Sequence, residues 1–259
     1  MDRHEDHEKK IERLNAFVRD SKAIVFFGGA GVSTESGIPD FRSKDGLYNQ
    51  RDIQFADYTP EYLLSDDCLI NEPKVFFEFY RQKLDVRTIK PNRAHYKLAE
   101  MEQKGKLSAI VTQNIDGLHE KAGSKKVYNI HGTTYRNYCM GFLHHNLPAD
   151  FIFEALQGKD AEEGIPRCPK CGAVVRPDVT LYGESLPEKA VNGAVSAIQH
   201  ADMLIIAGTS LTVYPAASFI RYYRGDRLVI INRDPTPADG MADLVFHESV
   251  GEVLSRIEL

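Results

Sequence analysis

Two short runs near the start of the chain carry residue types that could bind a nucleotide. Gly28-Gly29-Ala30-Gly31 follows an apolar run, and its backbone amides could approach a pyrophosphate because no side chains intervene. Gly37-Ile-Pro-Asp-Phe-Arg42 could place the Phe41 ring over a flat heterocycle and the Arg42 guanidinium against a phosphate. Each run also has an ordinary explanation, a tight strand-to-helix turn and a surface turn with one buried phenylalanine.

A polar run and a histidine add groups that could take part in catalysis. Thr112-Gln113-Asn114-Ile115-Asp116 directly follows an apolar run, at the carboxyl end of an expected strand, where α/β folds place their ligands. His131 lies beside a glycine and offers an imidazole, whose ordinary pKa of about 6.5 suits a general base near neutral pH. A lone histidine is more often structural, so His131 is a candidate only because the other runs accompany it.

The cysteines indicate a metal site rather than disulfides. Four cysteines are few for a disulfide scaffold in a chain of 259 residues. Cys168-Pro-Lys-Cys171 has the spacing of a thiolate knuckle for zinc. Cys68 lies apart from it and is interpreted as a packing residue. This use of cysteine favours a reducing compartment, and we expect a cytoplasmic protein.

The elements that must position these residues predict an α/β fold. Apolar runs typical of buried strands occupy residues 23–27, 107–112, 203–207, 228–231 and 244–246. Helical segments are expected at 11–20, near 92–104 with Asn92 as the cap, and near 188–200. Strands that alternate with helices predict a Rossmann-like, mostly parallel sheet covered on both faces.

Two stretches interrupt this alternation, and we expect them to form a smaller inserted lobe. Residues 44–88 contain aromatic-rich helical segments, and residues 136–176 contain three of the four cysteines. The expected division is a Rossmann-like domain (1–43, 89–135 and 177–259), a helical module (44–88) and a zinc-ribbon-like module (136–176). Ligands often bind in a cleft between such lobes, at the carboxyl ends of the strands.

Composition narrows the choice of partners. The formal net charge is −5, which argues against direct nucleic-acid binding because phosphate contacts usually need a basic face. No stretch approaches the roughly 20 apolar residues of a membrane span, so no membrane partner is expected. No Asp or Glu closes a βαβ unit about 20 residues after the glycine turn, as the dinucleotide fingerprint expects, which argues against an ordinary dehydrogenase.

Taken together, the motifs resemble those of the sirtuin family over nearly the whole chain. The matching runs, in family order, are Gly29-Ala30-Gly31-Val32-Ser33, Gly37-Ile-Pro-Asp-Phe-Arg42, Gln113-Asn-Ile-Asp116, His131-Gly132, Arg176-Pro177, Tyr182-Gly183-Glu184, Gly208-Thr209-Ser210-Leu211 and Pro215-Ala216-Ala217. The resemblance implies that the protein removes acyl groups from protein lysines with NAD as co-substrate. The products would be free lysine, nicotinamide and O-acyl-ADP-ribose.

The resemblance also implies roles for individual residues. His131 would be the catalytic base, and Asn114 would be the second catalytic residue, at the nicotinamide ribose. The remaining NAD-binding residues would be Ala30, Thr34, Phe41, Arg42, Gln113, Ile115, Asp116, Thr209, Ser210, Asn232 and Val250. An extended acyl-lysine peptide would add as a strand along residues near 179–183.

The zinc site departs from the family pattern, which holds a structural zinc on two Cys-x-x-Cys pairs. Cys168-Pro-Lys-Cys171 forms the second pair, and Cys139 is the first residue of the other. Phe142 stands where the fourth thiolate is expected. His144 or His145 could complete a Cys₃His site, or zinc could be held weakly or lost.

A second departure concerns the acyl group. Sirtuins that resemble desuccinylases carry Tyr-x-x-Arg on the small-lobe helix, whereas this chain has Tyr80-Arg81-Gln82-Lys83. Lys83 keeps the positive charge but lacks the bidentate fork of arginine, so acetyl or a longer apolar acyl group is the expected substrate.

Two alternative functions stay open. A mono-ADP-ribosyltransferase would cleave the same bond of NAD and differ only in the acceptor. A non-catalytic NAD-binding regulatory module is the other, and His131 together with the 113–116 run counts against it because a pure binder needs no base.

Overall fold

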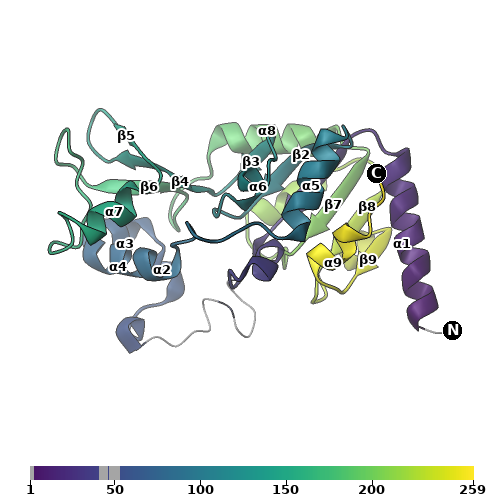
Figure 1. The fold of residues 1–259 in the computed structure, drawn as a ribbon, viewed down its shortest axis with the longest axis horizontal. Coiled ribbons are helices and arrows are strands. Elements are labelled where there is room, and N and C mark those ends of the chain that lie inside the picture. The colour runs from purple at the N-terminus through teal and green to yellow at the C-terminus, as the bar shows by residue number, and fades with distance from the viewer. Residues whose placement is uncertain (1–2, 41–45, 47–52) are drawn as a thin grey trace.

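A six-stranded parallel sheet forms the larger lobe of the protein, for which a computed structural model describes residues 3–40, 46 and 53–259 (Figure 1). The spatial order of its strands is β3-β2-β1-β7-β8-β9. Their bounds are β1 (Ile24–Gly28), β2 (Leu107–Thr112), β3 (Val127–Asn129), β7 (Met203–Ala207), β8 (Leu228–Ile231) and β9 (Leu244–Phe246). The five predicted strands are confirmed, and β3 is an additional edge strand.

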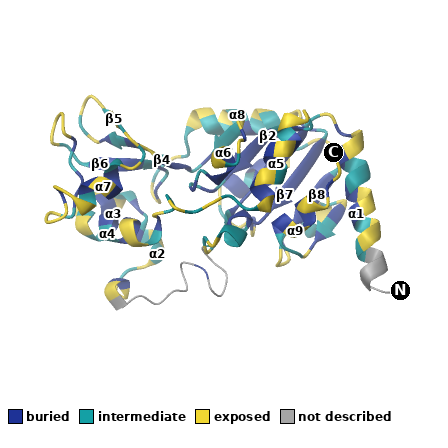
Figure 2. Cartoon of the chain, viewed as in Figure 1, coloured by how far each residue is buried: buried dark blue, intermediate teal, exposed yellow. Residues whose placement is uncertain are grey.

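Alternate residues of the buried strands face two separate helical layers. In β1, Ile24 and Phe26 belong to one core cluster. Val25 and Phe27 belong to the other, because successive side chains of a strand point to opposite faces. The first cluster includes residues of α1 (Arg3–Asp20), α5 (Arg93–Gln103) and α9 (Val250–Ser255), and the second includes residues of α8 (Glu188–Gln199) and the 3₁₀ helix η5 (Ala216–Tyr222). Burial on both faces explains why these strands are continuous apolar runs (Figure 2).

The predicted cap of the helix after Pro91 is confirmed. The Asn92 side chain accepts a hydrogen bond from the Ala94 amide at 2.9 Å, and the His95 ring accepts one from the Asn92 amide at 3.2 Å. These bonds satisfy two of the free amides at the start of α5.

The chain changes direction across the sheet between β1 and β7. From β1 it proceeds to β2 and β3 on one side, and from β7 to β8 and β9 on the other. Loops that leave the carboxyl ends of β1 and β7 therefore diverge, and this divergence opens the crevice in which α/β folds bind ligands. The short elements at this edge are η1 (Ala30–Val32), η2 (Thr34–Ser36), α6 (Leu118–Lys121) and η6 (Asp239–Met241).

A second, antiparallel sheet forms the smaller lobe together with four helices (Figure 1). Its strands are β5 (Asn146–Leu147), β4 (Gly132–Cys139) and β6 (Val175–Val179), in that spatial order. The helices are α2 (Pro60–Leu63), α3 (Asp66–Asn71), α4 (Pro73–Lys83) and α7 (Phe151–Gln157), and a 3₁₀ turn, η4 (Ile53–Phe55), precedes them. The expected smaller lobe is thus present. Strands β4 and β6 run across the boundaries expected at 135/136 and 176/177, and the division into those domain ranges stays a prediction.

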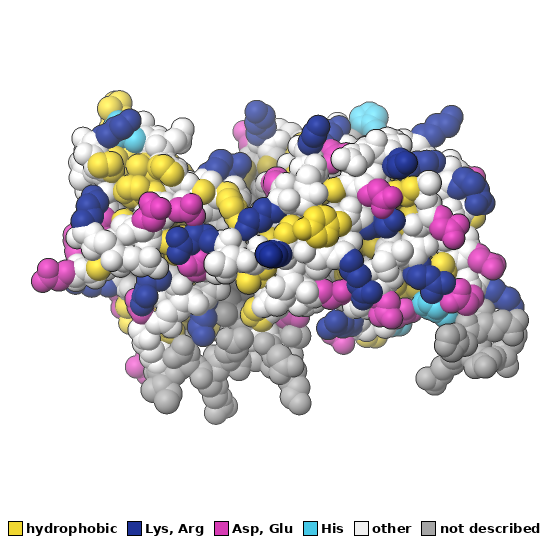
Figure 3. All heavy atoms as spheres, in the orientation of Figure 1, with side chains coloured by type: hydrophobic (Ala, Val, Ile, Leu, Met, Phe, Trp, Pro, Cys, Tyr) yellow, Lys and Arg dark blue, Asp and Glu magenta, His cyan; other side chains and the backbone are white. Residues whose placement is uncertain are grey.

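Helix hydropathy and surface charge both bear on the expected partners. No helix in the described part of the chain is long and apolar enough to cross a bilayer. Basic and acidic side chains are interspersed over the face in Figure 3.

Candidate active site and metal centre

A cleft of about 770 Å³ opens at the carboxyl ends of β1, β2, β7 and β8. Residues 179–184, which comprise the last residue of β6 and the loop after it, line the cleft from the smaller lobe. The predicted site residues that line the cleft are Ala30, Thr34, Gln113, Asn114, Ile115, His131, Thr209, Ser210, Asn232 and Val250. Asp116 lines a small adjoining cavity of about 50 Å³ instead. Phe41 and Arg42 lie outside the described residues.

The glycine turn after β1 has a different role from the one predicted for it. The Gly29 and Gly31 amides donate to the Ala207 and Gly208 carbonyls at 3.1 and 2.9 Å, so they are already engaged within the protein. A Cβ on Gly31 would lie 2.7 Å from the Gly208 Cα. The glycines are therefore required by the close approach of two chain turns, and the expected pyrophosphate cradle is wrong for these two amides. Ala30 is the residue between them that lines the cleft.

A buried chain of hydrogen bonds fixes the polar run after β2. Asn114 Nδ2 donates to Ser33 Oγ at 3.1 Å, and Ser33 Oγ donates to Asp116 Oδ2 at 2.7 Å. The Leu118 amide donates to the other Asp116 oxygen at 2.9 Å. Burial raises the pKa of Asp116, and the bonds from Leu118 and Ser33 partly oppose that shift. Asp116 therefore orients Asn114 through Ser33, a role of Ser33 that the sequence did not single out.

A second bond joins the ends of two strands across the crevice. Gln113 Nε2 donates to Thr209 Oγ1 at 3.0 Å, which links the loop after β2 to the loop after β7. The same hydroxyl accepts from the Leu211 amide at 3.2 Å. Gln113 and Thr209, both predicted to bind NAD, are therefore oriented by a hydrogen bond to one another.

The His131 ring is oriented by a backbone carbonyl. Nδ1 lies 3.0 Å from the Gln113 oxygen, and because a carbonyl only accepts, Nδ1 carries the hydrogen. The neutral ring then has its lone pair on Nε2. Burial lowers the pKa of His131, and the bond to Gln113 offsets part of that shift. An uncharged imidazole on a cleft wall is the form that a general base requires at neutral pH.

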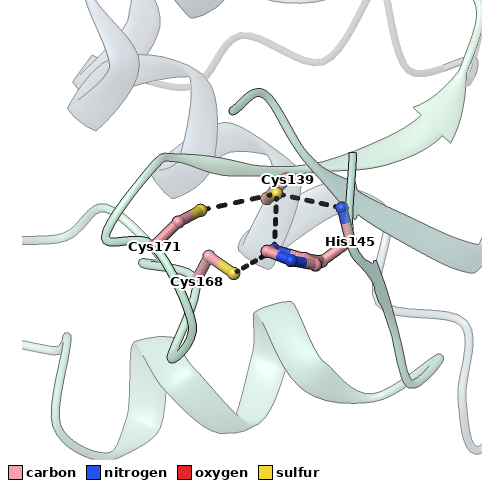
Figure 4. A group of neighbouring side chains, drawn as sticks. All are labelled: Cys139, His145, Cys168 and Cys171. Atoms are coloured by element: carbon pink, nitrogen blue, oxygen red, sulfur yellow. Dashed lines mark hydrogen bonds between the residues drawn. The ribbon is translucent and has the colours of Figure 1, made fainter. Parts of the chain in front are cut away.

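A metal-binding group lies at the far end of β4 (Figure 4). Cys139, Cys168, Cys171 and His145 place one donor atom each within 4.8 Å of one another. His144 is exposed and has a positive φ of 42°, and the Phe142 side chain is 97% exposed. The choice between the two histidines is therefore settled for this structure in favour of His145.

The donor atoms fit a tetrahedral zinc ion. Bond lengths of about 2.3 Å to sulfur and 2.0–2.1 Å to nitrogen require tetrahedral edges of about 3.8 Å between sulfurs and about 3.6 Å between sulfur and nitrogen. The sulfurs of Cys139 and Cys171 are 3.7 Å apart. His145 Nδ1 lies 3.6 Å from the sulfurs of both Cys139 and Cys168. These three donor pairs have the spacing of a tetrahedral zinc site, and the donor types, three cysteines and one histidine, are those of the Cys₃His set.

The two residues considered for acyl selection lie in different surroundings. Tyr80 is fully buried in the small-lobe core, where its ring stacks on Phe153 with a centroid distance of 5.4 Å. It lines neither cavity described above. Lys83, at the end of α4, lines the small cavity together with Asn114 and Ile115.

Comparison with known proteins gives one consistent family. The model of the Sir2 family matches residues 29–215. A protein of Clostridium perfringens named NAD-dependent protein deacetylase is 52% identical over 96% of this chain and 98% of its own length. Proteins of the same name from Clostridium acetobutylicum and Cutibacterium acnes are 50% and 48% identical over 96% and 95% of this chain, and over 98% and 97% of their own lengths.

Solved structures agree with these relatives. A Sir2 structure described as holding a p53 peptide and NAD⁺ has a TM-score of 0.81 and 34% identity, with 95% of this chain and 96% of that chain covered. A Sir2 structure bound to acetylated peptide has a TM-score of 0.82 and 32% identity over the same shares.

Proposed function

Because this chain belongs to the Sir2 family, we infer that it is an NAD-dependent protein deacetylase and that its cleft is the catalytic site. The observation that carries the assignment of the site is His131, an uncharged and oriented imidazole on the wall of the cleft. The acetyl-lysine peptide and NAD would meet there, between the sheet edge and residues 179–184.

NAD would occupy the part of the cleft formed by the sheet edge. Thr209, Ser210, Asn232 and Val250 would contact its adenosine half. Gln113, Asn114, Ile115 and Asp116 would hold the nicotinamide ribose and its carboxamide. Ala30 and Thr34 would line the same NAD site. Phe41 and Arg42 complete the proposed set from outside the described residues. The support for this set is that all but Asp116 of its described members line one cleft at the carboxyl ends of parallel strands.

The chemistry requires one proton acceptor. Bound NAD supplies a ribose carbon that becomes electron-poor as the bond to nicotinamide breaks, as in glycoside cleavage. The acetyl oxygen of the substrate lysine would attack that carbon. His131 Nε2 would take a proton from a ribose hydroxyl, whose oxygen would bond to the acetyl carbon. Protonation and departure of the lysine amine, with addition of one water to the acetyl carbon, would then leave O-acetyl-ADP-ribose. The Gln113 carbonyl, which holds Nδ1–H, stabilises the imidazolium that results.

The peptide would bind as an added strand along residues 179–183. These residues line the cleft next to His131, and extended peptides commonly bind by adding a strand to an existing edge. Relatives in the family have been solved with acetylated and propionylated peptides.

Zinc would be held by Cys139, His145, Cys168 and Cys171. It would supply a crosslink between the Cys139 end of β4 and the knuckle that precedes β6. None of the four cysteines, all of which lie in the described residues, forms a disulfide, and this supports the proposal of a reducing, cytoplasmic setting.

The test is deacetylation of an acetyl-lysine peptide by wild type, His131→Ala and His200→Ala. Loss of a general base should reduce kcat by about 10²–10⁴-fold in His131→Ala. His200 is exposed at the end of α8, so its variant should match wild type. Near-wild-type turnover by His131→Ala would refute the role of the base.

Mass spectrometry of the products separates deacetylation from the alternative transferase. O-acetyl-ADP-ribose is the expected product, in step with nicotinamide release. ADP-ribose attached to protein, without loss of acetyl groups, would identify a mono-ADP-ribosyltransferase instead. NAD binding without nicotinamide release would identify a regulatory module.

A further inference from the structure

Residues 179–184 form a wall segment whose position is tied to both lobes. The Thr180 amide donates to the His131 carbonyl at 2.9 Å, so the segment and the proposed base share a backbone bond. Toward helices α2 and α3, the Tyr182 amide donates to the Leu64 carbonyl at 3.0 Å. The Tyr182 carbonyl accepts from the Asp66 amide at 3.1 Å. Small shifts of the wall segment therefore change the distance between a bound peptide and His131.

Arg176, on β6, holds the two ends of the wall segment at once. Nη2 donates to the Val179 carbonyl at 2.8 Å and to Glu184 Oε2 at 2.9 Å. Nη1 donates to Glu184 Oε1. The Leu181 amide adds a fourth bond, to Glu184 Oε2 at 2.9 Å. One planar guanidinium and one carboxylate thereby close residues 179–184 into a turn.

The turn leaves a few backbone groups open on the cleft wall. Within the described part of the chain, the Thr180 carbonyl and the Gly183 amide and carbonyl have no hydrogen-bond partner. The other amides between 180 and 184 are satisfied by the bonds given above and by Glu184 N–H to the Leu181 carbonyl at 3.0 Å. Unpaired backbone groups on the wall of a cleft are the groups that an added strand can use.

In the Arg176–Glu184 pair, Arg176 is buried, Glu184 is half-buried, and both remain charged at neutral pH. The Arg176 side chain is 7% exposed and that of Glu184 is 27% exposed. Burial alone would raise the pKa of Glu184, but hydrogen bonds from Arg176 and Leu181 lower it on balance. A buried ion pair is weak evidence for stability, because desolvation opposes the attraction, and its best-attested use is to specify one arrangement.

A neighbouring ion pair on the same two strands provides a contrast. Arg136 on β4 and Asp178 on β6 are 2.7 Å apart, with side chains 60% and 39% exposed. This pair also bridges β4 and β6, yet it has no bond to residues 179–184 in the described structure. It therefore serves as a matched control for a bridge that lacks the link to the wall segment.

We propose that Arg176 and Glu184 are positioning residues for the substrate peptide. By holding Val179, Leu181 and each other, they set the curvature of the wall segment and keep the Thr180 and Gly183 backbone groups open to an acetyl-lysine peptide. The pair touches neither NAD nor the reacting atoms. The inference rests on the proposed function, in which this segment pairs with the peptide.

The test compares wild type with Arg176→Lys, Glu184→Gln, the double variant and the control Arg136→Gln. Lysine has one nitrogen in place of the two guanidinium nitrogens that contact the Val179 carbonyl and the Glu184 carboxylate, so it cannot reproduce this planar fork. Loss of charged hydrogen bonds should raise the peptide KM about tenfold in Arg176→Lys, with the KM for NAD within about twofold of wild type. Arg136→Gln should leave both constants unchanged. The double variant should be no worse than the poorer single variant, because the two residues act as one unit.

A binding measurement makes the result independent of turnover. Fluorescence anisotropy of a labelled acetyl-lysine peptide, measured with each variant and with wild type, should show the same tenfold loss for Arg176→Lys. Equal peptide affinity in Arg176→Lys and wild type would overturn the proposal, as would a parallel rise of both KM values with a lower unfolding temperature. If wild type binds the peptide but does not deacetylate it, the proposed function fails while the positioning role is still decided. If wild type binds no peptide, both fail.

Discussion

The two ends of the β4–β6 ladder differ in how far their geometry restricts the sequence. At the catalytic end, Gly132 has a φ of 76°, and a Cβ there would overlap the Asp178 carbonyl oxygen. His131 beside it is held by the Gln113 carbonyl. At the metal end, the fourth donor comes from the loop between β4 and β5, and Phe142, at the position expected for a thiolate, points into solvent.

The difference follows from what each end must hold. The base must present one nitrogen in one orientation. The Gln113 carbonyl fixes the ring, and only glycine fits at position 132 beside it. A tetrahedral ion accepts any sulfur or nitrogen donor that reaches the open vertex. His145 reaches that vertex three residues after Phe142, so the metal end accommodates a change that the catalytic end could not.

The largest expected effect tests whether the metal end depends on His145. His145→Ala leaves three thiolates and an open vertex, so zinc affinity should fall by more than the roughly hundredfold seen when only a supporting residue is lost. Zinc per chain after purification, followed by competition with a chelator, measures it. His144→Ala is the matched control, since the His144 ring is exposed and outside the metal-binding group. Retention of zinc by His145→Ala, or its loss from His144→Ala, would contradict the assignment.

The same variant sharpens the comparison between the two ends. NAD should bind to His145→Ala about as well as to wild type, because the residues proposed for NAD lie at the edge of the parallel sheet. The small lobe, by contrast, should become sensitive to proteolysis, because structural zinc contributes folding free energy. Equal weakening of NAD binding and of the small lobe would show that the two ends are not separable.

The larger lobe could be predicted from sequence because its strands are buried on both faces. Runs such as 107–112 and 203–207 are continuously apolar, and the structure begins and ends these two strands at the same residues. The smaller sheet was missed for the opposite reason. Strand β4 is a mixture of polar and aromatic residues, and its partner β6 is distant in sequence, so no local pattern indicates their pairing.

Parts of the site depend on tertiary contacts that spacing does not carry. Gly29 and Gly31 were expected to face a phosphate, but they lie against Gly208, which is distant in the chain. The choice between His144 and His145 depends on which ring lies beside the cysteines, and only the folded loop defines that. The run 113–116 was identified because its residue types are unusual after a buried strand, whereas Ser33, which links Asn114 to Asp116, is an ordinary serine in sequence.

An intermediate effect concerns two buried histidines on α5 and α6, one of which packs against Phe26 of β1. The rings of His95 and His119 are 4.8 Å apart, and both side chains are almost fully buried. Burial lowers the pKa of His95 to about 4, with a small opposing effect from Glu35. Burial, followed by the neighbouring His95, lowers the pKa of His119 well below its usual value. Both rings are therefore neutral in the folded protein.

This pair should make the free energy of unfolding depend on pH. Below the unfolded pKa of about 6.5 the unfolded chain binds more protons, so stability is complete above pH 6.5 and falls as the pH drops toward about 4. The slope should approach 1.4 kcal/mol per pH unit for each histidine. Urea unfolding between pH 7.5 and 5.5 measures it. His95→Gln keeps a side chain able to reach the Asn92 amide and should reduce the slope, whereas the exposed His200→Ala should not. An unchanged slope in His95→Gln would contradict the prediction.

The smallest expected effect concerns the acyl group, at the point where the two lobes meet. Lys83 lines the small cavity beside Asn114, whereas Tyr80 is packed in the small-lobe core and cannot join it in holding an acidic acyl chain without repacking. Wild type should therefore turn over acetyl-peptide faster than succinyl-peptide. Lys83→Arg should improve succinyl turnover by no more than about threefold, the scale of one partly exposed charge contact, and the exposed Lys104→Arg should not alter it. If Lys83→Arg alone made succinyl the better substrate, the charge at this position rather than the packing of the small lobe would determine acyl choice.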